Sequence, residues 1–385
     1  MHTQVGILGA GPAGLTLAML LRGEGIDCVV LETRDRAYVE KRVRAGLLEQ
    51  NTVDLLRELG VGERLDREGL EHNGIYLRHG GTNHYIDMAA LTGRHITIYG
   101  QQEVVKDLTN ALLSKGVPIH FEVGDVTLHD LESALPRIAY EHEGPNELTC
   151  DAIAGCDGFH GVSRPTIAEH LTEHEYVYAF GWLGILAEAQ PATDELIYAW
   201  HADGFALYTM RSQTISRLYL QVPADEDIEN WPDERIWAAL RTRLGNVNEG
   251  RIVDKGITPM RSFVAEPMQY GRLFLAGDSA HIVPPTGAKG LNLAVNDVRL
   301  LAPALTELIR KGETGRADGY TTAALGRVWR AQDFSNYMTQ MLHDLGGGPF
   351  QERLQLARLE YIARSEAAAH SLAENYVGLP AEPEF

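Results

Sequence analysis

The chain has 385 residues, 44% of them hydrophobic, so it is long enough to bury a large core and to form two or three domains. Its formal net charge of −19 argues against a nucleic-acid surface, which needs a basic face. No apolar run approaches the roughly 20 residues of a membrane span, and no charged leader precedes the first strand, so we expect a cytoplasmic protein without a signal peptide.

The three cysteines, Cys28, Cys150 and Cys156, lack the spacing of metal ligands. Two of them lie in apolar, strand-like runs, where cysteine usually behaves as a small hydrophobe. We therefore expect neither a metal site nor a disulfide framework.

The first informative stretch is a glycine-rich turn inside a βαβ pattern. Residues 5–8 and 28–31 are apolar and strand-like, and a helix is expected over 12–21. In such a unit the first glycine of Gly9-x-Gly-x-x-Gly14 permits a tight turn, and the second lets a pyrophosphate approach the backbone. The third lets helix and strand pack closely. Glu32 follows at the distance from which a carboxylate accepts hydrogen bonds from a ribose, so a dinucleotide is expected here.

A basic segment follows the second strand. Such a run is usually a solvated surface, but five cations together are unusual in so acidic a chain, and guanidinium groups suit phosphate recognition. We favour nucleotide phosphate contacts for some of Arg34, Arg36, Lys41, Arg42 and Arg44.

The next elements follow from hydrophobic spacing. Residues 47–59 have a helical repeat that ends at Gly60, and residues 101–115 have another. Between them, 75–77, 84–86 and 96–98 are short alternating runs that predict antiparallel strands.

Two further strands each end in an acidic residue. Residues 151–154 lead to Asp157-Gly158, with His160 and Arg164 just beyond, and residues 273–275 lead to Gly277-Asp278. Ligands of open α/β sheets bind at such carboxyl ends. A loop rich in proline and glycine then precedes a helix expected from about Leu291, and its backbone donors suit an anion or a flavin carbonyl.

The middle and the last third differ in periodicity. The runs 195–200, 205–210 and 217–222 alternate, as strands with one face toward a ligand do. Residues 291–309, 320–345 and 353–374 are expected to be helices, with Gly346-Gly-Gly348 as a break.

Taken jointly, Gly9-x-Gly-x-x-Gly14, Cys156-Asp-Gly158 and Gly277-Asp278 resemble the three signatures of the single-component FAD-dependent aromatic hydroxylases. The resemblance runs along the whole chain. It rests further on the segments 42–50, 155–161, 180–184, 261–264, 281–292 and 374–380.

The resemblance implies an α/β (α+β) fold with a Rossmann-like FAD-binding domain, an inserted antiparallel-sheet substrate domain and a helical C-terminal segment. The implied FAD domain comprises 1–70, 98–174 and 259–345, the substrate domain 71–97 and 175–258, and the helical segment 346–385. Implied FAD contacts are Gly9, Gly11, Ala13, Gly14, Glu32, Arg42, Val43, Arg44, Ala45, Gly46, Leu47, Gln101, Asp157, Asp278, Lys289, Gly290, Leu291 and Asn292.

The resemblance also assigns the substrate contacts. Arg211 is implied as the partner of a substrate carboxylate, with Tyr219 and Thr209 beside it, and Thr209 stands where the family usually has serine. Tyr198 is implied to contact the substrate phenol, with Tyr376 behind it in a hydrogen-bonded chain that ends at His72. Met210, Pro285 and Thr286 complete the implied set, with Pro285 counted among the catalytic residues.

The implied reaction is hydroxylation of 4-hydroxybenzoate at C3 through a flavin C4a-hydroperoxide, with O2 as co-substrate and NADPH or NADH as reductant. Alternatives are a hydroxylase of 3-hydroxybenzoate or 3,4-dihydroxybenzoate, or a flavin-binding sensor without turnover. A homodimer is also implied. The implied nicotinamide-nucleotide contacts are Tyr38, Arg42, Arg44, His160, Arg164 and Arg261.

Overall fold

The structure is a computed structural model that describes residues 1–42 and 46–379. The βαβ unit is present as β1 (His2–Leu8), α1 (Pro12–Gly23) and β2 (Cys28–Leu31). It lies at the centre of the first sheet, whose strands β18, β11, β1, β2 and β8 are parallel. The other strands are β8 (Ile119–His120), β9 (Gly124–His129), β10 (Arg137–Glu141), β11 (Pro145–Gly155), β17 (Gln269–Tyr270) and β18 (Leu273–Leu275).

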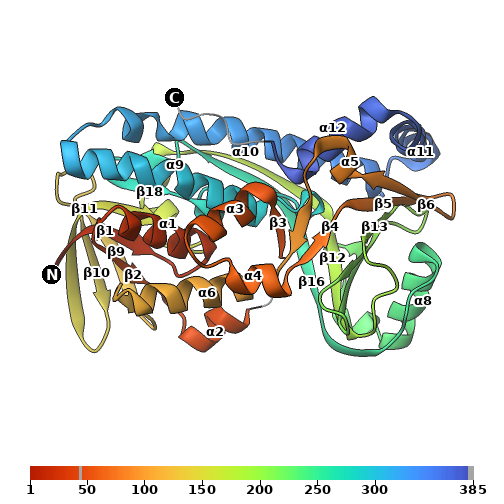
Figure 1. The fold of residues 1–385 in the computed structure, drawn as a ribbon, viewed down its shortest axis with the longest axis horizontal. Coiled ribbons are helices and arrows are strands. Elements are labelled where there is room, and N and C mark those ends of the chain that lie inside the picture. The colour runs from red at the N-terminus through yellow and green to blue at the C-terminus, as the bar shows by residue number, and fades with distance from the viewer. Residues whose placement is uncertain (43–45, 380–385) are drawn as a thin grey trace.

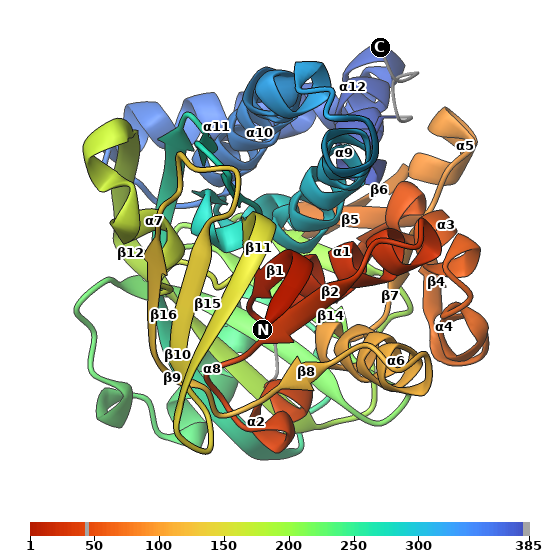
Figure 2. The same ribbon diagram turned by 90° about the vertical axis from the view of Figure 1, so that its left-hand side faces the viewer.

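The helices α1, α6 and α9 lie on one face of this first sheet, because α1 contacts both α6 and α9 and its Gly14 faces Ile7 of β1. Strand β10 lies over the opposite face, where a Cβ on Gly6 would meet Ile138. Figures 1 and 2 show α9 and α10 on one side of α1, and α2 and α6 on the other side of that helix. The bounds are α2 (Arg36–Lys41), α3 (Gln50–Glu58), α4 (Glu63–Glu68), α6 (Gln101–Ser114), α7 (Ser163–Thr166), α9 (Gly290–Lys311) and α10 (Gly315–Leu342). Short 3-10 turns lie at η1 (Ala168–His170), η3 (Gly277–Ser279) and η4 (Pro285–Gly287).

The second sheet has the order β19-β16-β12-β15-β14-β13-β5-β6 and lies at the right of Figure 1. Its pairs are antiparallel except β13 with β5, which come from distant parts of the chain and run parallel. The strands are β5 (Gly74–His79), β6 (Thr82–Asp87), β12 (Thr172–Glu188), β13 (Leu196–Ala199), β14 (Ala206–Met210), β15 (Ser216–Pro223), β16 (Arg251–Glu266) and β19 (His281–Ile282).

The two faces of the second sheet bury different partners. Leu183, Ile197 and Leu218 pack on one face with α8 (Asp233–Leu244), which follows the 3-10 turn η2 (Ile228–Asn230). Trp182, Tyr198 and Leu207 pack on the other with α11 (Gly348–Arg364) and α12 (Glu366–Val377). Because side chains alternate between the two faces of a strand, the predicted substrate residues Tyr198 and Tyr219 lie on this second face.

The strands β12 and β16 join the two halves of the molecule. They pair along most of their length, from Thr172 with Glu266 to Glu188 with Arg251. The domain limits expected at 174/175 and 258/259 fall inside these continuous strands. The division into domains therefore stays a prediction.

Two expected helices are wrong in extent. The helix expected over 47–59 begins only at Gln50, because Leu47–Glu49 forms strand β3 and pairs with β7 (Ile96–Ile98). Strand β4 (Leu70–His72) adds to the same small sheet, so 96–98 does not join the substrate sheet. The helix expected over 353–374 is interrupted at Ser365, whose hydroxyl accepts a hydrogen bond from the N–H of Ala368 and so begins α12. The short helix α5 (Met88–Thr92) was not expected.

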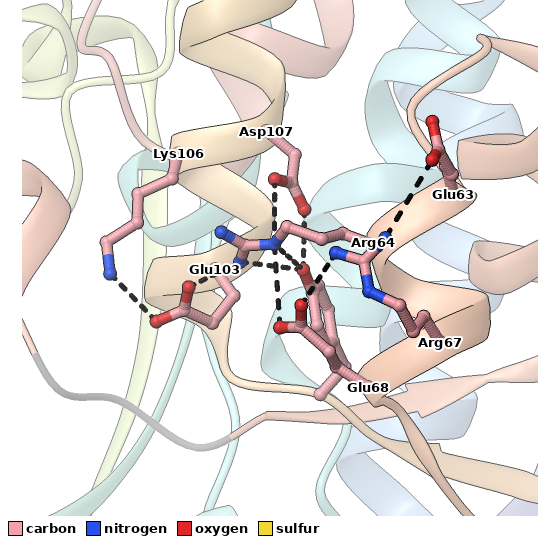
Figure 3. A network of polar contacts seen from close by, with 8 residues as sticks. Glu63, Arg64, Arg67, Glu68, Glu103, Lys106 and Asp107 are labelled. Carbon is pink, nitrogen blue, oxygen red and sulfur yellow. Dashed lines mark hydrogen bonds and ion pairs between the residues drawn. The ribbon is translucent and has the colours of Figure 1, made fainter.

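A charged network holds the N-terminal part of α6 against α4 (Figure 3). Arg64 donates to the Tyr99 hydroxyl at 2.8 Å and forms ion pairs with Glu103 and Asp107. The Tyr99 hydroxyl in turn donates to Asp107 at 2.6 Å. Burial raises the pKa of Asp107 above its ordinary value. With a further ion pair to Glu68 at 3.7 Å, one partly buried guanidinium thus contacts three carboxylates and a phenol.

Replacing Arg64 with Met should lower the free energy of unfolding by about 1–3 kcal/mol, because three carboxylates and a phenol then lose their shared cation. Urea unfolding measures this change. The matched control is Arg67→Met on the same helix, where the side chain is 59% exposed and pairs with Glu63 and Glu68. We expect the control to stay within about 0.5 kcal/mol of the parent. Equal losses in both variants would contradict a special role for Arg64.

Candidate active site

The glycine turn between β1 and α1 is built for close approach. Gly9 has a φ of +96°, and a Cβ there would lie 2.4 Å from the carbonyl oxygen of Cys156. A Cβ on Gly14 would lie 2.1 Å from the Gly9 carbonyl oxygen. At Gly11, in contrast, a Cβ would meet nothing within 4 Å, so the backbone of the turn is open on that side.

The same turn offers donors for an anion. Gly11 is the N-cap of α1 and provides no side chain to the first N–H groups of the helix. Glu32 is held beside them, since its Oε2 accepts a hydrogen bond from the N–H of Ala10 at 2.8 Å. Its Oε1 accepts one from the N–H of Arg34 at 2.8 Å. An open backbone, uncapped donors and a fixed acid fit the diphosphate and ribose of FAD.

The carboxyl ends of β11 and β18 add two acids. Asp157 accepts a hydrogen bond from the N–H of Ser163 through Oδ2 at 2.9 Å. Its Oδ1 is buried and has no hydrogen-bond partner among the described residues. Burial raises the pKa of Asp157. Asp278 is exposed at the 3-10 turn after β18, where Gly277 has a φ of +68°. The unsatisfied Oδ1 of Asp157 can therefore accept a hydrogen bond from a ligand at this edge of the sheet.

The loop before α9 is fixed by a buried ion pair. Lys289 Nζ lies 2.6 Å from Oε1 of Glu49 and also donates to the Tyr376 carbonyl oxygen. Burial lowers the pKa of Lys289, and the Glu49 carboxylate partly offsets this. The Oδ1 of Asn292 accepts hydrogen bonds from Glu49 N–H and the Thr52 hydroxyl, and its amide donates to the Leu47 carbonyl oxygen.

These contacts use the side chains of Lys289 and Asn292 within the protein. What remains available to a cofactor in this loop is backbone, at Gly290 and Leu291 in the uncapped first turn of α9. Of the other predicted FAD contacts, Leu47 begins β3 and Gln101 begins α6. Gly46, just before β3, accepts a hydrogen bond from the N–H of Tyr99 through its carbonyl oxygen. The predicted contacts Val43, Arg44 and Ala45 lie outside the described residues.

One face of the second sheet collects the predicted substrate residues. Tyr198 on β13 lies opposite Leu207 on β14, and Leu207 lies opposite Tyr219 on β15. Thr209 lies opposite Arg217 in the same ladder. Because directly opposed residues and residues two apart share a face, all five point to one side.

Two guanidinium groups lie at one end of this face. Arg211 donates to Oε1 of Gln102 at 2.6 Å, and Arg217 donates to the Tyr219 hydroxyl at 2.7 Å. Burial, and then the nearby charge of Arg217, lower the pKa of Arg211. Among the described residues, the buried Nη1 of Arg217 has no hydrogen-bond partner, and neither arginine forms an ion pair with a carboxylate. The arrangement fits an anionic ligand.

Tyr219 lies on the face that carries the other predicted substrate residues. Met210, which is adjacent to Thr209 on β14, lies on the opposite face. Arg217 and Gln102 were not predicted as site residues. The spacing of Arg217, two residues before Tyr219 on a strand, was the signal that could have identified it. Gln102 gave no such signal, since it becomes a partner of Arg211 only when α6 meets the second sheet.

A buried pair of tyrosines lies at the other end of the face. The hydroxyls of Tyr198 and Tyr376 are 2.6 Å apart, and both side chains are almost fully buried. Burial raises the pKa of both phenols above the ordinary value. His72 is buried at the end of β4, and no direct hydrogen bond joins it to Tyr376 within the described residues. The pair can pass a proton, because each hydroxyl both donates and accepts.

The predicted contacts of the loop at 285–286 differ in exposure. Pro285 is exposed in the turn η4, whereas Thr286 is fully buried and accepts a hydrogen bond from the Thr339 hydroxyl at 3.0 Å. Only the first of them presents its side chain outside the core.

The predicted nicotinamide residues form two groups. Arg164 and Arg261 both lie over the ring of Phe159, at 4.7 and 4.8 Å, and His160 is exposed next to it. Each arginine also forms an ion pair, Arg164 with Glu173 and Arg261 with Glu175. Separately, Arg34 and Arg42 lie over the ring of the exposed Tyr38.

No arrangement of three or more His, Cys, Asp or Glu that could hold a metal ion occurs within residues 1–42 and 46–379. Cys28, Cys150 and Cys156 are free and buried. None of the described helices has the length and apolar character needed to cross a membrane.

Known proteins that resemble this chain match it over nearly its whole length. The family model of the FAD binding domain matches residues 2–335. The p-hydroxybenzoate hydroxylase of Acinetobacter baylyi is 47% identical, over 99% of this chain and 96% of that protein. The crystal structure of p-nitrophenol 4-monooxygenase PnpA from Pseudomonas putida has a TM-score of 0.83 at 19% identity, covering 99% of this chain and 100% of that one. The latter likeness concerns the fold alone.

Replacing Lys289 with Met should lower the free energy of unfolding by about 3–5 kcal/mol, because the Glu49 carboxylate is then buried without its cation. Urea unfolding measures the loss. The double variant with Glu49→Gln removes the charge as well and should recover a large part of it. If the single and double variants are equally unstable, the ion pair is not what holds the loop.

Proposed function

This chain belongs to the family of the FAD binding domain, and on that premise we propose that it is a 4-hydroxybenzoate 3-monooxygenase. The observation that carries the proposal is one sheet face with two guanidinium groups at one end, neither of which has a carboxylate partner among the described residues, and a buried tyrosine pair at the other. A molecule with a carboxylate and a phenol hydroxyl at opposite ends of one ring complements both. This is the shape of 4-hydroxybenzoate.

The cationic end binds and orients the substrate. Arg211 would exchange its hydrogen bond to Gln102 for a bidentate pair with the substrate carboxylate, with Arg217 and the Tyr219 hydroxyl beside it. The Thr209 hydroxyl, on the same face, adds a further polar contact, and its methyl group narrows the space around the ring. Fixing the carboxylate sets the direction of the ring and so decides which carbon reacts.

The tyrosine end ionises the substrate. A phenolate is a far better carbon nucleophile than a phenol, whose ordinary pKa is near 10. Tyr198 accepts the hydrogen bond of the substrate hydroxyl and passes its own proton toward Tyr376, 2.6 Å away. Both tyrosines stay neutral at rest, because burial raises their pKa values. The pair therefore moves a proton without holding charge.

FAD, when bound, supplies hydride acceptance from NADPH or NADH and the activation of O2. The residues that would hold it are the open turn 9–14, Glu32, Asp157, and the backbone of Gly290 and Leu291. The Phe159 group with Arg164, Arg261 and His160, and Tyr38 with Arg42, would contact the nicotinamide nucleotide. The homodimer and the cytoplasmic location expected from the sequence also remain predictions.

The test is oxidation of NADPH and of NADH by the FAD-loaded protein, with and without 4-hydroxybenzoate, with the product identified by chromatography. We expect strong stimulation and 3,4-dihydroxybenzoate as product. Parallel assays with 3-hydroxybenzoate and 3,4-dihydroxybenzoate serve as comparisons. Stimulation that yields only peroxide, or stimulation by one of the comparison acids alone, would show that 4-hydroxybenzoate is the wrong substrate.

A further inference from the structure

We propose that Glu195 is the exit of the proton path, the group that takes the substrate's proton from His72 and delivers it to solvent. This inference rests on the proposed function and extends it. It concerns a residue that lies outside the tyrosine pair and touches neither substrate nor cofactor.

The need for such a group follows from burial. Tyr198, Tyr376 and His72 are all in the interior, and the His72 side chain is 0% exposed. A path that ended at His72 would leave the proton inside the protein. The Glu195 side chain, in contact with His72, is 15% exposed, and its neighbour Tyr85 is 43% exposed. Exposure thus increases stepwise from His72 outward.

The contacts of Glu195 fix its carboxylate for this task. Its Oε2 lies 2.9 Å from Nδ1 of His72, within ion-pair distance, although the angles at these two buried atoms are not those of a hydrogen bond in this structure. Its Oε1 accepts hydrogen bonds from the N–H of Asn73 at 3.1 Å and from the Tyr85 hydroxyl at 3.3 Å. Glu195 directly precedes β13, which pairs in parallel with β5, so the ladder itself places the carboxylate next to His72.

The second ring nitrogen of His72 is also buried. Like Nδ1, Nε2 has no hydrogen-bond partner among the described residues. A buried polar atom of this kind suits a water-mediated hydrogen bond, which can connect it with the Tyr376 hydroxyl. Tyr376 is close enough to feel the pair, because Glu195 contributes, after burial and Tyr198, to the raised pKa of Tyr376.

The proton balance of the path is complete. The substrate phenol gives its proton to the Tyr198 oxygen while the Tyr198 proton moves to Tyr376, and the Tyr376 proton reaches Nε2 of His72. His72 gives its Nδ1 proton to Oε2 of Glu195, and the carboxylic acid releases it to solvent water. The phenol is left as phenolate, solvent gains one proton, each tyrosine keeps one proton, and His72 changes from the Nδ1–H to the Nε2–H tautomer. The reverse relay, which returns one proton from solvent to the oxygen of the ring, restores every protein group to its initial state.

Other titratable groups surround the pair and set the background of any pH profile. Tyr85 donates to Glu195, and its pKa is raised by burial and then by Glu195 and Asp87. The ring of Tyr76 contacts that of Tyr85 at a tilt of 47°, with the ring centroids 5.0 Å apart. On the neighbouring strands His95 lies 3.3 Å from Glu71, which precedes His72.

The experiment follows proton release when the FAD-loaded protein binds 4-hydroxybenzoate, by stopped flow with a pH indicator in weak buffer at neutral pH. Glu195→Gln keeps the shape of the side chain but cannot carry a proton. We expect the release rate and kcat to fall about tenfold or more, with KM for 4-hydroxybenzoate within about twofold of the parent. Glu195→Asp, which keeps the carboxylate, should fall between the two.

Glu71→Gln is the matched control, because it removes a carboxylate next to His72 in sequence that pairs with His95 instead. It should release the proton at the parent rate. Parent-like release by Glu195→Gln would overturn the proposal, as would a Glu195→Asp variant that is folded and as slow as Glu195→Gln. A parent protein that binds 4-hydroxybenzoate without releasing a proton or forming 3,4-dihydroxybenzoate would overturn the proposed function, and this inference with it.

Discussion

Two partly buried cations, for which the described residues supply no carboxylate partner, are the constraint on which the active-site face depends. Burial, and then the nearby charge of Arg217, lower the pKa of Arg211, so a positive charge at this place is costly. The surrounding fold keeps them there nonetheless: Gln102 at the start of α6 holds Arg211, and Tyr219 holds Arg217. The network of Arg64 in turn anchors α6. A substrate carboxylate would neutralise these guanidinium groups, and its hydrogen bonds to them would orient the substrate.

The opposite end of the face solves a different problem, the movement of a proton without a buried charge. Tyr198 and Tyr376 come from a sheet and from the last helix, and the loop before α9 connects them to the cofactor side, because Lys289 bonds both Glu49 and the Tyr376 backbone. A single buried ion pair thus joins the strand β3, the loop before α9 and the helix that carries Tyr376. Glu195 extends this path to a surface that His72 does not reach.

Local patterns predicted much of the fold. The βαβ unit, the strand before Asp157 and the sheet strands at 196–223 follow from alternation and glycine placement, which act over a few residues. The errors arise where long-range pairing decides: Leu47 and Leu48 fit a helical stripe, yet β7 recruits them into a strand. The partners of individual side chains were harder to predict from the sequence. Asn292 was expected at the cofactor, but its side chain is used by Glu49 and Thr52, a contact across some 240 residues that no local pattern encodes.

The most direct measurement compares the binding of 4-hydroxybenzoate and 4-hydroxybenzamide to the FAD-loaded protein, followed by the change in flavin absorbance. The two ligands share shape and phenol but differ in charge at the end that faces the arginines. The account predicts that the acid binds about 100-fold more tightly, as expected for a charge-assisted pair in a buried site. Equal affinities would contradict it, because the buried guanidinium groups would then not be a carboxylate site.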